Sequence, residues 1–281
     1  LVAVEAPTYV DALQAFGPYQ PRYVQIATDE NGLLPDALEA ILRQEPPKFI
    51  YLTPTFQNPT GRTLNLERRQ RVAELVQRYN VLLIEDDPYS DLRYQGESLP
   101  PIKHFAPEHV VYTSTLSKVF APGLRIGFCA APPLVRQWLV IVKQGVDLHT
   151  SSYNQALAAE YLSGGYLRAH LPTIIELYRP RQQAMLQALD RHLPEGFTWS
   201  QPQGGMFIWV EGPPGLDAIA LYHQAVARKT AFVPGTFFFA RRGDGLATMR
   251  LNFTMVDEAT IERAVEVLAS VIREQATAPT H

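Results

Sequence analysis

The sequence has only one cysteine, Cys129, among its 281 residues. A lone thiol excludes an internal disulfide, and we therefore predict a protein of the cytoplasm. Cys129 stands within the apolar run RIGFCAA (125–131), which is typical of a buried strand. We expect it to be a small buried hydrophobic side chain rather than a reactive group.

An excess of positive charge is also missing, because the net charge is −3. This balance provides no broad basic field for nucleic acid or an anionic membrane. No apolar run approaches the roughly 20 residues of a membrane-spanning helix. The start, LVAVEAPTYV, has neither a basic region nor a cleavage site, so we expect no signal peptide. The seven histidines form no cluster with metal-ligand spacing, which argues against a metal site.

Strand-like and helix-like segments alternate in the first half of the chain. Strands are expected at 22–28, 48–54 and 81–87, and helices at 35–45 and 65–80. The strands are continuous apolar runs, as in a parallel sheet that is buried on both faces. The pattern therefore predicts an α/β fold with a doubly wound, mostly parallel sheet.

The second half predicts a smaller α+β domain. Strands at 109–116 and 125–131 and helices at 133–149 and 152–162 complete the first domain, and SGG (163–165) is the best linker signal. A long helix follows, in which Pro172 and Pro180 predict a kink or a break. Strands at 197–201, 205–211, 231–235 and 248–254 and helices at 216–228 and 257–275 complete the chain. We expect the domains to be residues 1–164 and 165–281.

Polar residues follow several of the predicted strands. In an open α/β sheet, ligands bind outside the carboxyl ends of the strands, so these side chains are expected to converge. Each also has a purely structural interpretation, such as a turn former, a helix cap or a solvated lysine. Together they offer an amide, carboxylates, a phenol, a hydroxyl, an amine and a guanidinium: Asn58, Asp86, Asp87, Tyr89, Ser117, Lys118 and Arg125.

Pyridoxal phosphate requires this set of groups. Lysine supplies the amine that forms a Schiff base with the aldehyde. A carboxylate beside the pyridinium nitrogen keeps the ring protonated, so that the ring withdraws electrons. An amide and a phenol can hydrogen-bond the ring oxygen, while hydroxyls and an arginine bind the phosphate.

The blocks FQNPTG, EDDPY, STLSK, GLRIG and MRLNF occur in this order along the chain. They resemble the signature blocks of the fold-type I, class I/II aminotransferases. Within that family they are similar to the 2-aminoadipate and kynurenine aminotransferases and to the aminotransferase-like domains of MocR regulators. The resemblance extends over essentially all 281 residues, and the block around Lys118 is its most specific part.

The resemblance implies a role for each matching residue. Lys118 would make the covalent link to the cofactor and move the substrate proton. Asp86 would hold the pyridinium nitrogen, since the family places this carboxylate three residues before the tyrosine and Asp87 fits less well. Asn58 and Tyr89 would bind the ring oxygen, and Asn58 would also contact the substrate.

Five further positions match the family. Ser117 and Arg125 would bind the phosphate, together with Thr115, where the family usually has serine. Tyr9 matches an aromatic residue that stacks on the cofactor ring, although core packing is an equal alternative. Arg250 matches the arginine that grips the substrate α-carboxylate in a two-pronged pair, the alternative being a surface arginine on a strand edge.

The resemblance thus implies an aminotransferase that acts on an L-amino acid (2-aminoadipate, aromatic or branched-chain) and a 2-oxo acid such as 2-oxoglutarate. Family members are usually homodimers. The alternative is a PLP-sensing effector domain of a MocR-type regulator, and another PLP reaction would use the same cofactor residues. Family members also have a further N-terminal part with a phosphate-binding glycine loop, which we expect to be missing before Leu1.

Overall fold

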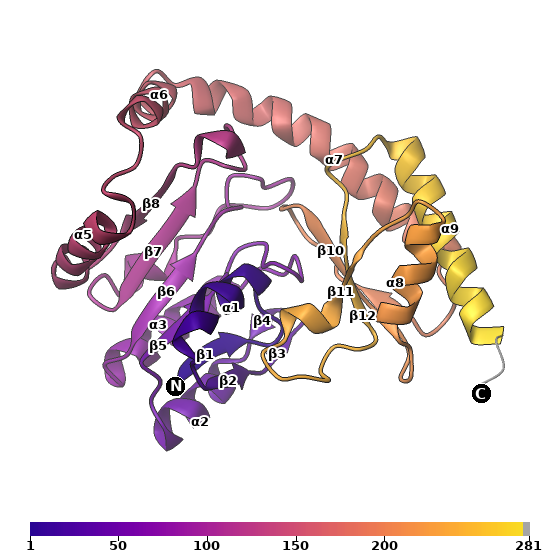
Figure 1. Cartoon of the computed structure of the whole chain (residues 1–281), viewed down its shortest axis with the longest axis horizontal. Helices are drawn as coiled ribbons and strands as arrows, with labels where there is room; N and C mark the ends of the chain where they lie inside the picture. The colour runs from indigo at the N-terminus through magenta and orange to yellow at the C-terminus, as the bar shows by residue number, and fades with distance from the viewer. Residues whose placement is uncertain (278–281) are drawn as a thin grey trace.

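The computed structural model describes residues 1–277 and contains a six-stranded sheet in the order β2-β1-β5-β6-β7-β8. Its strands are β1 (Val2–Glu5), β2 (Tyr23–Ile26), β5 (Phe49–Leu52), β6 (Leu82–Asp86), β7 (Val110–Thr115) and β8 (Gly127–Ala130). Neighbouring strands are parallel except for β8, which runs antiparallel to β7 (Figure 1). The predicted α/β fold with a mostly parallel sheet is confirmed.

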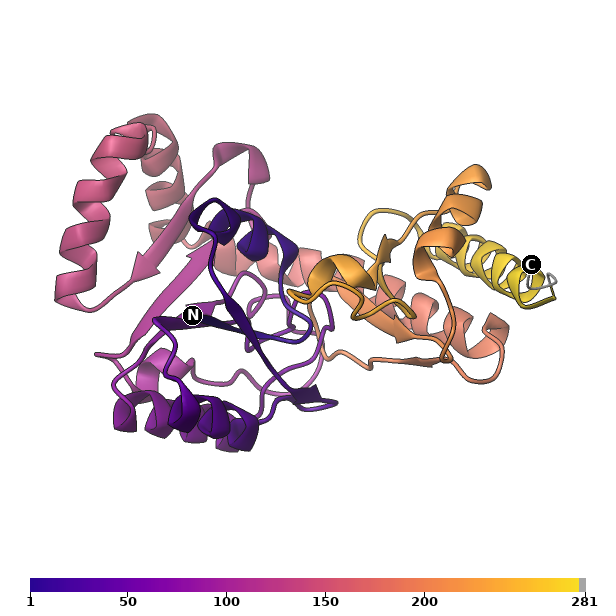
Figure 2. The same ribbon diagram turned by 60° about the horizontal axis from the view of Figure 1, so that its bottom comes forward.

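Helices cover both faces of this sheet. On one face lie α2 (Pro35–Gln44) and α3 (Leu66–Arg78), with the short α4 (Ile102–Phe105) beside α3, and on the other lies α1 (Val10–Phe16) (Figure 2). Leu38, Leu75 and Leu83 belong to the buried apolar cluster between the sheet and α2–α3. Val4 and Ala12 belong to a smaller cluster under α1. This double burial explains the continuous apolar strands of the sequence.

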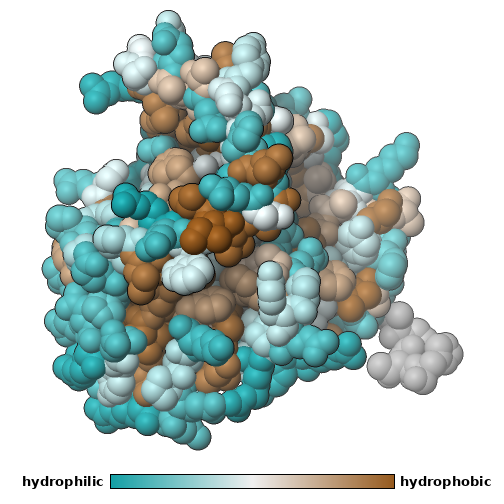
Figure 3. Space-filling view, turned by 60° about the vertical axis from the view of Figure 1, so that its left-hand side comes forward, coloured by the Kyte–Doolittle hydropathy of each residue, from teal (hydrophilic) through white to brown (hydrophobic). Residues whose placement is uncertain are grey.

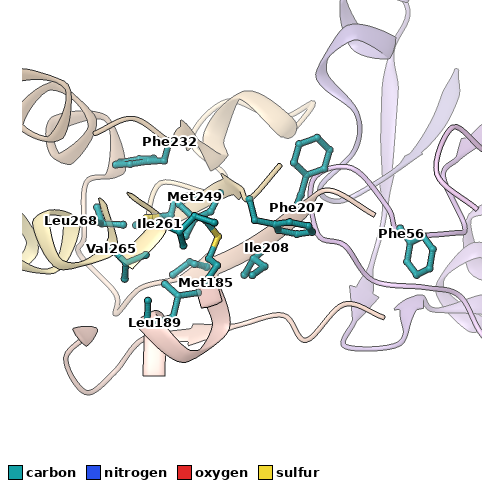
Figure 4. Close-up of a cluster of buried hydrophobic side chains, with 14 of the residues drawn as sticks. Phe56, Met185, Leu189, Phe207, Ile208, Phe232, Met249, Ile261, Val265 and Leu268 are labelled. Carbon is teal, nitrogen blue, oxygen red and sulfur yellow. The ribbon is translucent and has the colours of Figure 1, made fainter. Parts of the chain in front are cut away.

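A second, four-stranded sheet has the order β11-β12-β10-β9. Its strands are β9 (Thr198–Trp199), β10 (Phe207–Glu211), β11 (Val233–Pro234) and β12 (Thr248–Asn252), with α8 (Ala218–Ala227) and α9 (Glu258–Thr277) nearby. Figure 4 shows Met185, Phe232, Met249 and Val265 meeting in its apolar core. A two-stranded ribbon of β3 (Thr28–Asp29) and β4 (Gly32–Leu33) completes the strands described. The domain boundary after residue 164 stays a prediction.

The long helix α7 (Tyr166–His192) runs without interruption through Pro172 and Pro180. The sequence predicted a kink or a break at these prolines, and the prediction of a break is wrong. Both prolines are exposed, so solvent can hydrate the carbonyl groups that they leave unpaired. Two shorter helices, α5 (Pro133–Asp147) and α6 (Ser152–Ser163), precede it. Within residues 1–277, no helix combines the length and the apolar character needed to cross a membrane.

Cys129 is exposed, and the prediction that it is buried in a strand is wrong. All four residues of β8 are exposed, since β8 is an edge strand that nothing in residues 1–277 covers. Leu134 and Trp138 of α5 are exposed as well, at 67% and 59%. Figure 3 shows hydrophobic side chains gathered on the side of the molecule that β8 and α5 occupy in Figure 1. The apolar pattern predicted the strand correctly but not its surroundings.

Arg69 of α3 holds together three segments of the loop region above the sheet. Its side chain is 1% exposed. Its Nε donates to Leu64 O at 2.8 Å, and its Nη2 donates to Pro54 O at 3.0 Å and Thr55 Oγ1 at 2.8 Å. Nη1 donates to Pro100 O at 3.2 Å. A buried guanidinium is tolerated here because its donors have partners.

Two buried glutamates carry raised pKa values. Glu5, at the end of β1, accepts from Thr53 N at 2.9 Å, and burial raises its pKa to about 8. Glu85, in β6, accepts from Ile102 N and Lys103 N at 2.8 Å each. Burial raises the pKa of Glu85 to about 7, although both backbone donors oppose the shift. Both carboxyl groups therefore hold a proton more tightly in the folded chain than in the unfolded one.

We expect Arg69→Met to lower the free energy of unfolding by about 3 kcal/mol or more, because it leaves several buried acceptors without donors. Arg78→Met is the matched control on the same helix. The Arg78 side chain is 54% exposed and contacts Glu39 at 3.2 Å, so its loss should change stability by less than about 1 kcal/mol. Urea unfolding of both variants measures the difference, and equal effects would contradict this role of Arg69.

We also expect stability to fall as the pH rises from about 5 to about 8. In this range the unfolded glutamates have lost their protons, whereas folded Glu5 and Glu85 still bind theirs. The free energy of unfolding therefore falls as the pH rises through this range. It becomes constant above a pH of about 8, where the folded glutamates have lost their protons too. Urea unfolding across this range measures the slope. Glu5→Gln, which cannot ionise, should make it shallower, and a stability that rises with pH would refute this explanation.

Candidate active site

A cavity of about 270 Å³ lies at the carboxyl ends of β5, β6 and β7. This is the edge at which open α/β sheets bind ligands. Its lining contains all eight residues that the sequence predicts for cofactor binding, together with Thr53, Pro88 and Pro122. The eight are Tyr9, Asn58, Asp86, Tyr89, Thr115, Ser117, Lys118 and Arg125.

Asn58 lies in the loop that follows β5 and is buried. Its Nδ2 lies 3.5 Å from the hydroxyl of Tyr89, and its Oδ1 accepts a hydrogen bond from Arg250 Nη1 at 2.9 Å. The loop needs a glycine at Gly61, which has φ +68°, and a Cβ there would lie 2.7 Å from the carbonyl oxygen of Phe207. The sequence FQNPTG thus forms a tight turn that presents the amide to the cavity.

Asp86 lies at the end of β6 and faces the cavity, whereas Asp87 does not line it. Tyr51 donates to Asp86 Oδ2 at 2.6 Å and Thr113 donates to its Oδ1 at 3.1 Å. Burial raises the pKa of Asp86, and these two hydrogen bonds oppose the shift. Asp87 instead accepts from Tyr112 at 2.9 Å. The structure therefore presents one of the two carboxylates, held in a fixed orientation.

Tyr51 and Thr113 were missed by the sequence analysis. Thr113 is the register partner of Asp86 in the neighbouring strand, and Tyr51 is one position before the end of β5. The signal available was a hydroxyl-bearing residue near the end of each strand that flanks β6. These hydroxyl groups can reach Asp86 only because β5 and β7 flank β6, and the local sequence pattern does not predict that strand order.

Hydroxyl groups gather at the end of β7. Thr115 Oγ1 lies 2.9 Å from Ser117 Oγ and 3.0 Å from Ile126 O, and it accepts from Ser117 N at 3.1 Å. Arg125 is exposed and has the left-handed backbone value φ 54°, directly after the turn Pro122–Leu124. Lys118 is half-buried and lines the same cavity. Hydroxyls and a guanidinium on one wall suit a phosphate group.

Two tyrosines line the cavity as well. Burial raises the pKa of Tyr89 to about 12, while the positive charge of Arg250 opposes the shift. Tyr9 donates its hydroxyl hydrogen to Asp11, and burial raises the Tyr9 pKa. Both phenols therefore remain protonated near neutral pH and can donate hydrogen bonds.

Arg250, in β12 of the second sheet, does not line the cavity itself but donates to Asn58, which does. Its guanidinium stacks over the ring of Phe207 at 4.1 Å and lies 5.0 Å from the ring of Phe238. Within residues 1–277 its buried Nε has no hydrogen-bond partner. Burial lowers the pKa of Arg250, which still leaves a cation at neutral pH. A half-buried guanidinium with an unused donor is suited to a carboxylate ligand.

The donor set of the cavity fits pyridoxal phosphate. It offers an amine in Lys118, a carboxylate in Asp86 and hydrogen-bonding groups in Asn58 and Tyr89. The wall around Ser117 offers hydroxyls for the phosphate. These are the functional groups that the aldehyde, ring nitrogen, ring oxygen and phosphate of this cofactor need.

Comparison with known proteins agrees with this chemistry. The family described as "Aminotransferase class I and II" matches residues 1–268. The chain is 47% identical to aromatic-amino-acid aminotransferase 1 of Thermococcus litoralis, covering 98% of this chain and 67% of that protein. It is 41% identical to the 2-aminoadipate transaminase of Thermus thermophilus, covering 97% of this chain and 69% of that protein.

A solved structure shows the same fold. The kynurenine aminotransferase of Pyrococcus horikoshii, in complex with PMP, superposes with a TM-score of 0.96 at 44% identity, covering 99% of this chain and 70% of that one. PMP is the aminated form of pyridoxal phosphate, so this cofactor agrees with the donor set of the cavity. Pyridoxal phosphate is the cofactor that the family and the cavity support, and the chain belongs to the class I and II aminotransferases.

Proposed function

We propose that this aminotransferase moves an amino group between an L-amino acid and a 2-oxo acid such as 2-oxoglutarate. The observation that carries the proposal is the position of Arg250 beside the cavity that contains Lys118 and Asp86. The amine of Lys118 and the carboxyl group of Asp86 line this cavity, and the guanidinium of Arg250 is one hydrogen bond away from it, through Asn58. This combination suits a substrate that bears both an amino group and an α-carboxylate.

For the amino-acid substrate we propose 2-aminoadipate, an aromatic or a branched-chain amino acid. The names of the relatives support the first two classes, since they include an aromatic-amino-acid aminotransferase and a 2-aminoadipate transaminase. The buried rings of Phe207 and Phe238 pack against the guanidinium of Arg250 and hold it near the proposed carboxylate position.

Lys118 is the proposed catalytic residue. Pyridoxal phosphate, when bound, supplies the electron sink that makes the substrate Cα–H bond acidic. Lys118 Nζ would hold the cofactor covalently and then, once free, take up the proton of the substrate Cα. It is half-buried, so the cavity restricts the access of water to this amine.

The remaining residues would orient the reacting groups. Asp86, itself held by Tyr51 and Thr113, would pair with the ring nitrogen. Asn58 and Tyr89 would hydrogen-bond the ring oxygen. Thr115, Ser117 and Arg125 would bind the phosphate, and Tyr9 would stack on the ring. Arg250 would bind the substrate carboxylate through its guanidinium, with Asn58 beside it.

We further propose a cytoplasmic homodimer with a cofactor domain at residues 1–164 and a smaller domain at 165–281. The regulatory alternative, a PLP-sensing effector domain, would need the same cofactor residues but no turnover. Arg250, which is half-buried and hydrogen-bonded to Asn58 of the cavity, favours turnover because its guanidinium suits a substrate carboxylate.

Lys118→Ala should abolish the visible absorbance of protein-bound pyridoxal phosphate, because no amine remains at the site to bind the aldehyde. The measurement is an absorption spectrum after loading and dialysis. Reduction of the wild-type protein with borohydride, followed by peptide mass spectrometry, should locate the cofactor on Lys118. Lys48→Ala, which changes an exposed lysine, is the control and should retain the spectrum. A cofactor adduct on another lysine would refute the assignment.

Arg250→Lys should raise the KM for both the amino acid and the oxo acid by about tenfold or more, because lysine cannot make the two-pronged carboxylate pair. The assay uses 2-aminoadipate, phenylalanine or leucine with 2-oxoglutarate and measures glutamate formed. Arg191→Lys, on the exposed end of α7, should leave both KM values unchanged. Unchanged KM values in the Arg250 variant would disprove its substrate role, and no glutamate from any wild-type reaction would favour the regulatory alternative.

A further inference from the structure

A buried pair of side chains outside the cavity, Glu5 and Gln57, connects two segments that reach the site. Both are 4% exposed. Glu5 Oε2 accepts from Thr53 N at 2.9 Å and lies 3.5 Å from Gln57 Nε2. Gln57 Nε2 also donates to Pro7 O at 2.7 Å. The amide of Gln57 therefore attaches the loop after β5 to the segment that follows β1.

The side-chain oxygen of Gln57 accepts hydrogen bonds from a residue of its own loop. Gln57 Oε1 accepts from Thr60 N at 2.9 Å and from Thr60 Oγ1 at 2.6 Å. The main chain of Gln57 closes the loop as well, since its N–H donates to Arg62 O at 2.8 Å and its carbonyl accepts from Gly61 N at 2.6 Å. One side chain thus fixes the loop internally and fastens it to a neighbouring segment.

Asn58 follows Gln57 directly, so its position depends on this attachment. Asn58 Oδ1 is the acceptor for Arg250 Nη1, and its Nδ2 faces Tyr89. The other attached segment leads through Pro7 to Tyr9, which lines the cavity. Glu5 and Gln57 themselves are separated from the reaction centre, because neither lines that cavity.

We propose that Glu5 and Gln57 are positioning residues that fix Asn58, and through it the guanidinium of Arg250, for binding of the substrate carboxylate. The inference rests on the proposed function of the site for its kinetic consequence. Its structural part, the attachment of the loop at residues 57–62 to the segment at 5–7, stands on the hydrogen bonds alone. Two buried polar side chains whose hydrogen bonds fix a loop and its neighbouring segments are typical of a preorganised binding group.

Gln57→Glu is the discriminating variant. It keeps an acceptor for Thr60, and once ionised it offers no donor to Pro7 O and places a second carboxylate against Glu5. Glu5→Gln is its matched control, because a single oxygen of Glu5 accepts both hydrogen bonds and the amide oxygen of glutamine can replace it. Only the first variant breaks the link between the two segments.

We expect Gln57→Glu to raise the KM for both the amino acid and the oxo acid by about tenfold, with kcat changed less than about threefold. Glu5→Gln should keep both KM values within about twofold of wild type. A fall in kcat and thermal stability with unchanged KM would mean a merely structural role and would overturn the proposal. Equal KM increases in both variants would overturn it as well, because the control retains the link.

Hydrogen–deuterium exchange of the protein without cofactor tests the same inference independently of turnover. Gln57→Glu should speed exchange of the amides at residues 57–62 by about tenfold, and Glu5→Gln should not. If the wild-type chain binds no pyridoxal phosphate, the proposed function fails while this comparison still decides the inference. Unchanged exchange in Gln57→Glu would show that the loop does not depend on the link and would refute it.

Discussion

The hydrogen bond from Arg250 Nη1 to Asn58 Oδ1 is the contact on which the proposed site depends. It joins β12 of the four-stranded sheet to the loop after β5 of the six-stranded sheet. Stacking on Phe207 holds the guanidinium from its own sheet, so the arginine is fixed from both sides. A substrate carboxylate that binds here would contact residues from both sheets. Its affinity would therefore depend on the position of one sheet relative to the other.

The sequence predicted the strand ends well because the carboxyl edge of a parallel sheet has a local signature. Asn58, Asp86 and Lys118 each stand shortly after a continuous apolar run, and the structure brings them to one cavity. The spacing of Asp86 from Tyr89 also distinguished it from Asp87, which turns toward Tyr112. The strand ends required only the alternation of strands and helices and the chemistry of each side chain, whereas the choice of Asp86 over Asp87 came from the resemblance to the aminotransferase family.

What the sequence did not predict depends on neighbours that are distant along the chain. Thr113 orients Asp86 only because β6 and β7 pair in the register that places these residues side by side. Cys129 has the apolar surroundings of a buried residue, yet its strand lies at the sheet edge and is exposed. Pro172 breaks many helices, but in α7 it lies on an exposed side. Burial and register are tertiary properties that local pattern cannot give.

The cost of burying Glu5 gives a physical reason to connect it with function. Burial raises its pKa to about 8, so ionising this carboxyl group near neutral pH opposes folding. An apolar residue at the end of β1 would avoid that cost, but it could not accept from Thr53 and Gln57. Side chains that reduce stability but fix neighbouring loop segments are expected where one of those segments carries a binding group. Here the turn carries Asn58, the acceptor for Arg250, so a loss of stability at Glu5 is exchanged for a defined position of the carboxylate-binding group.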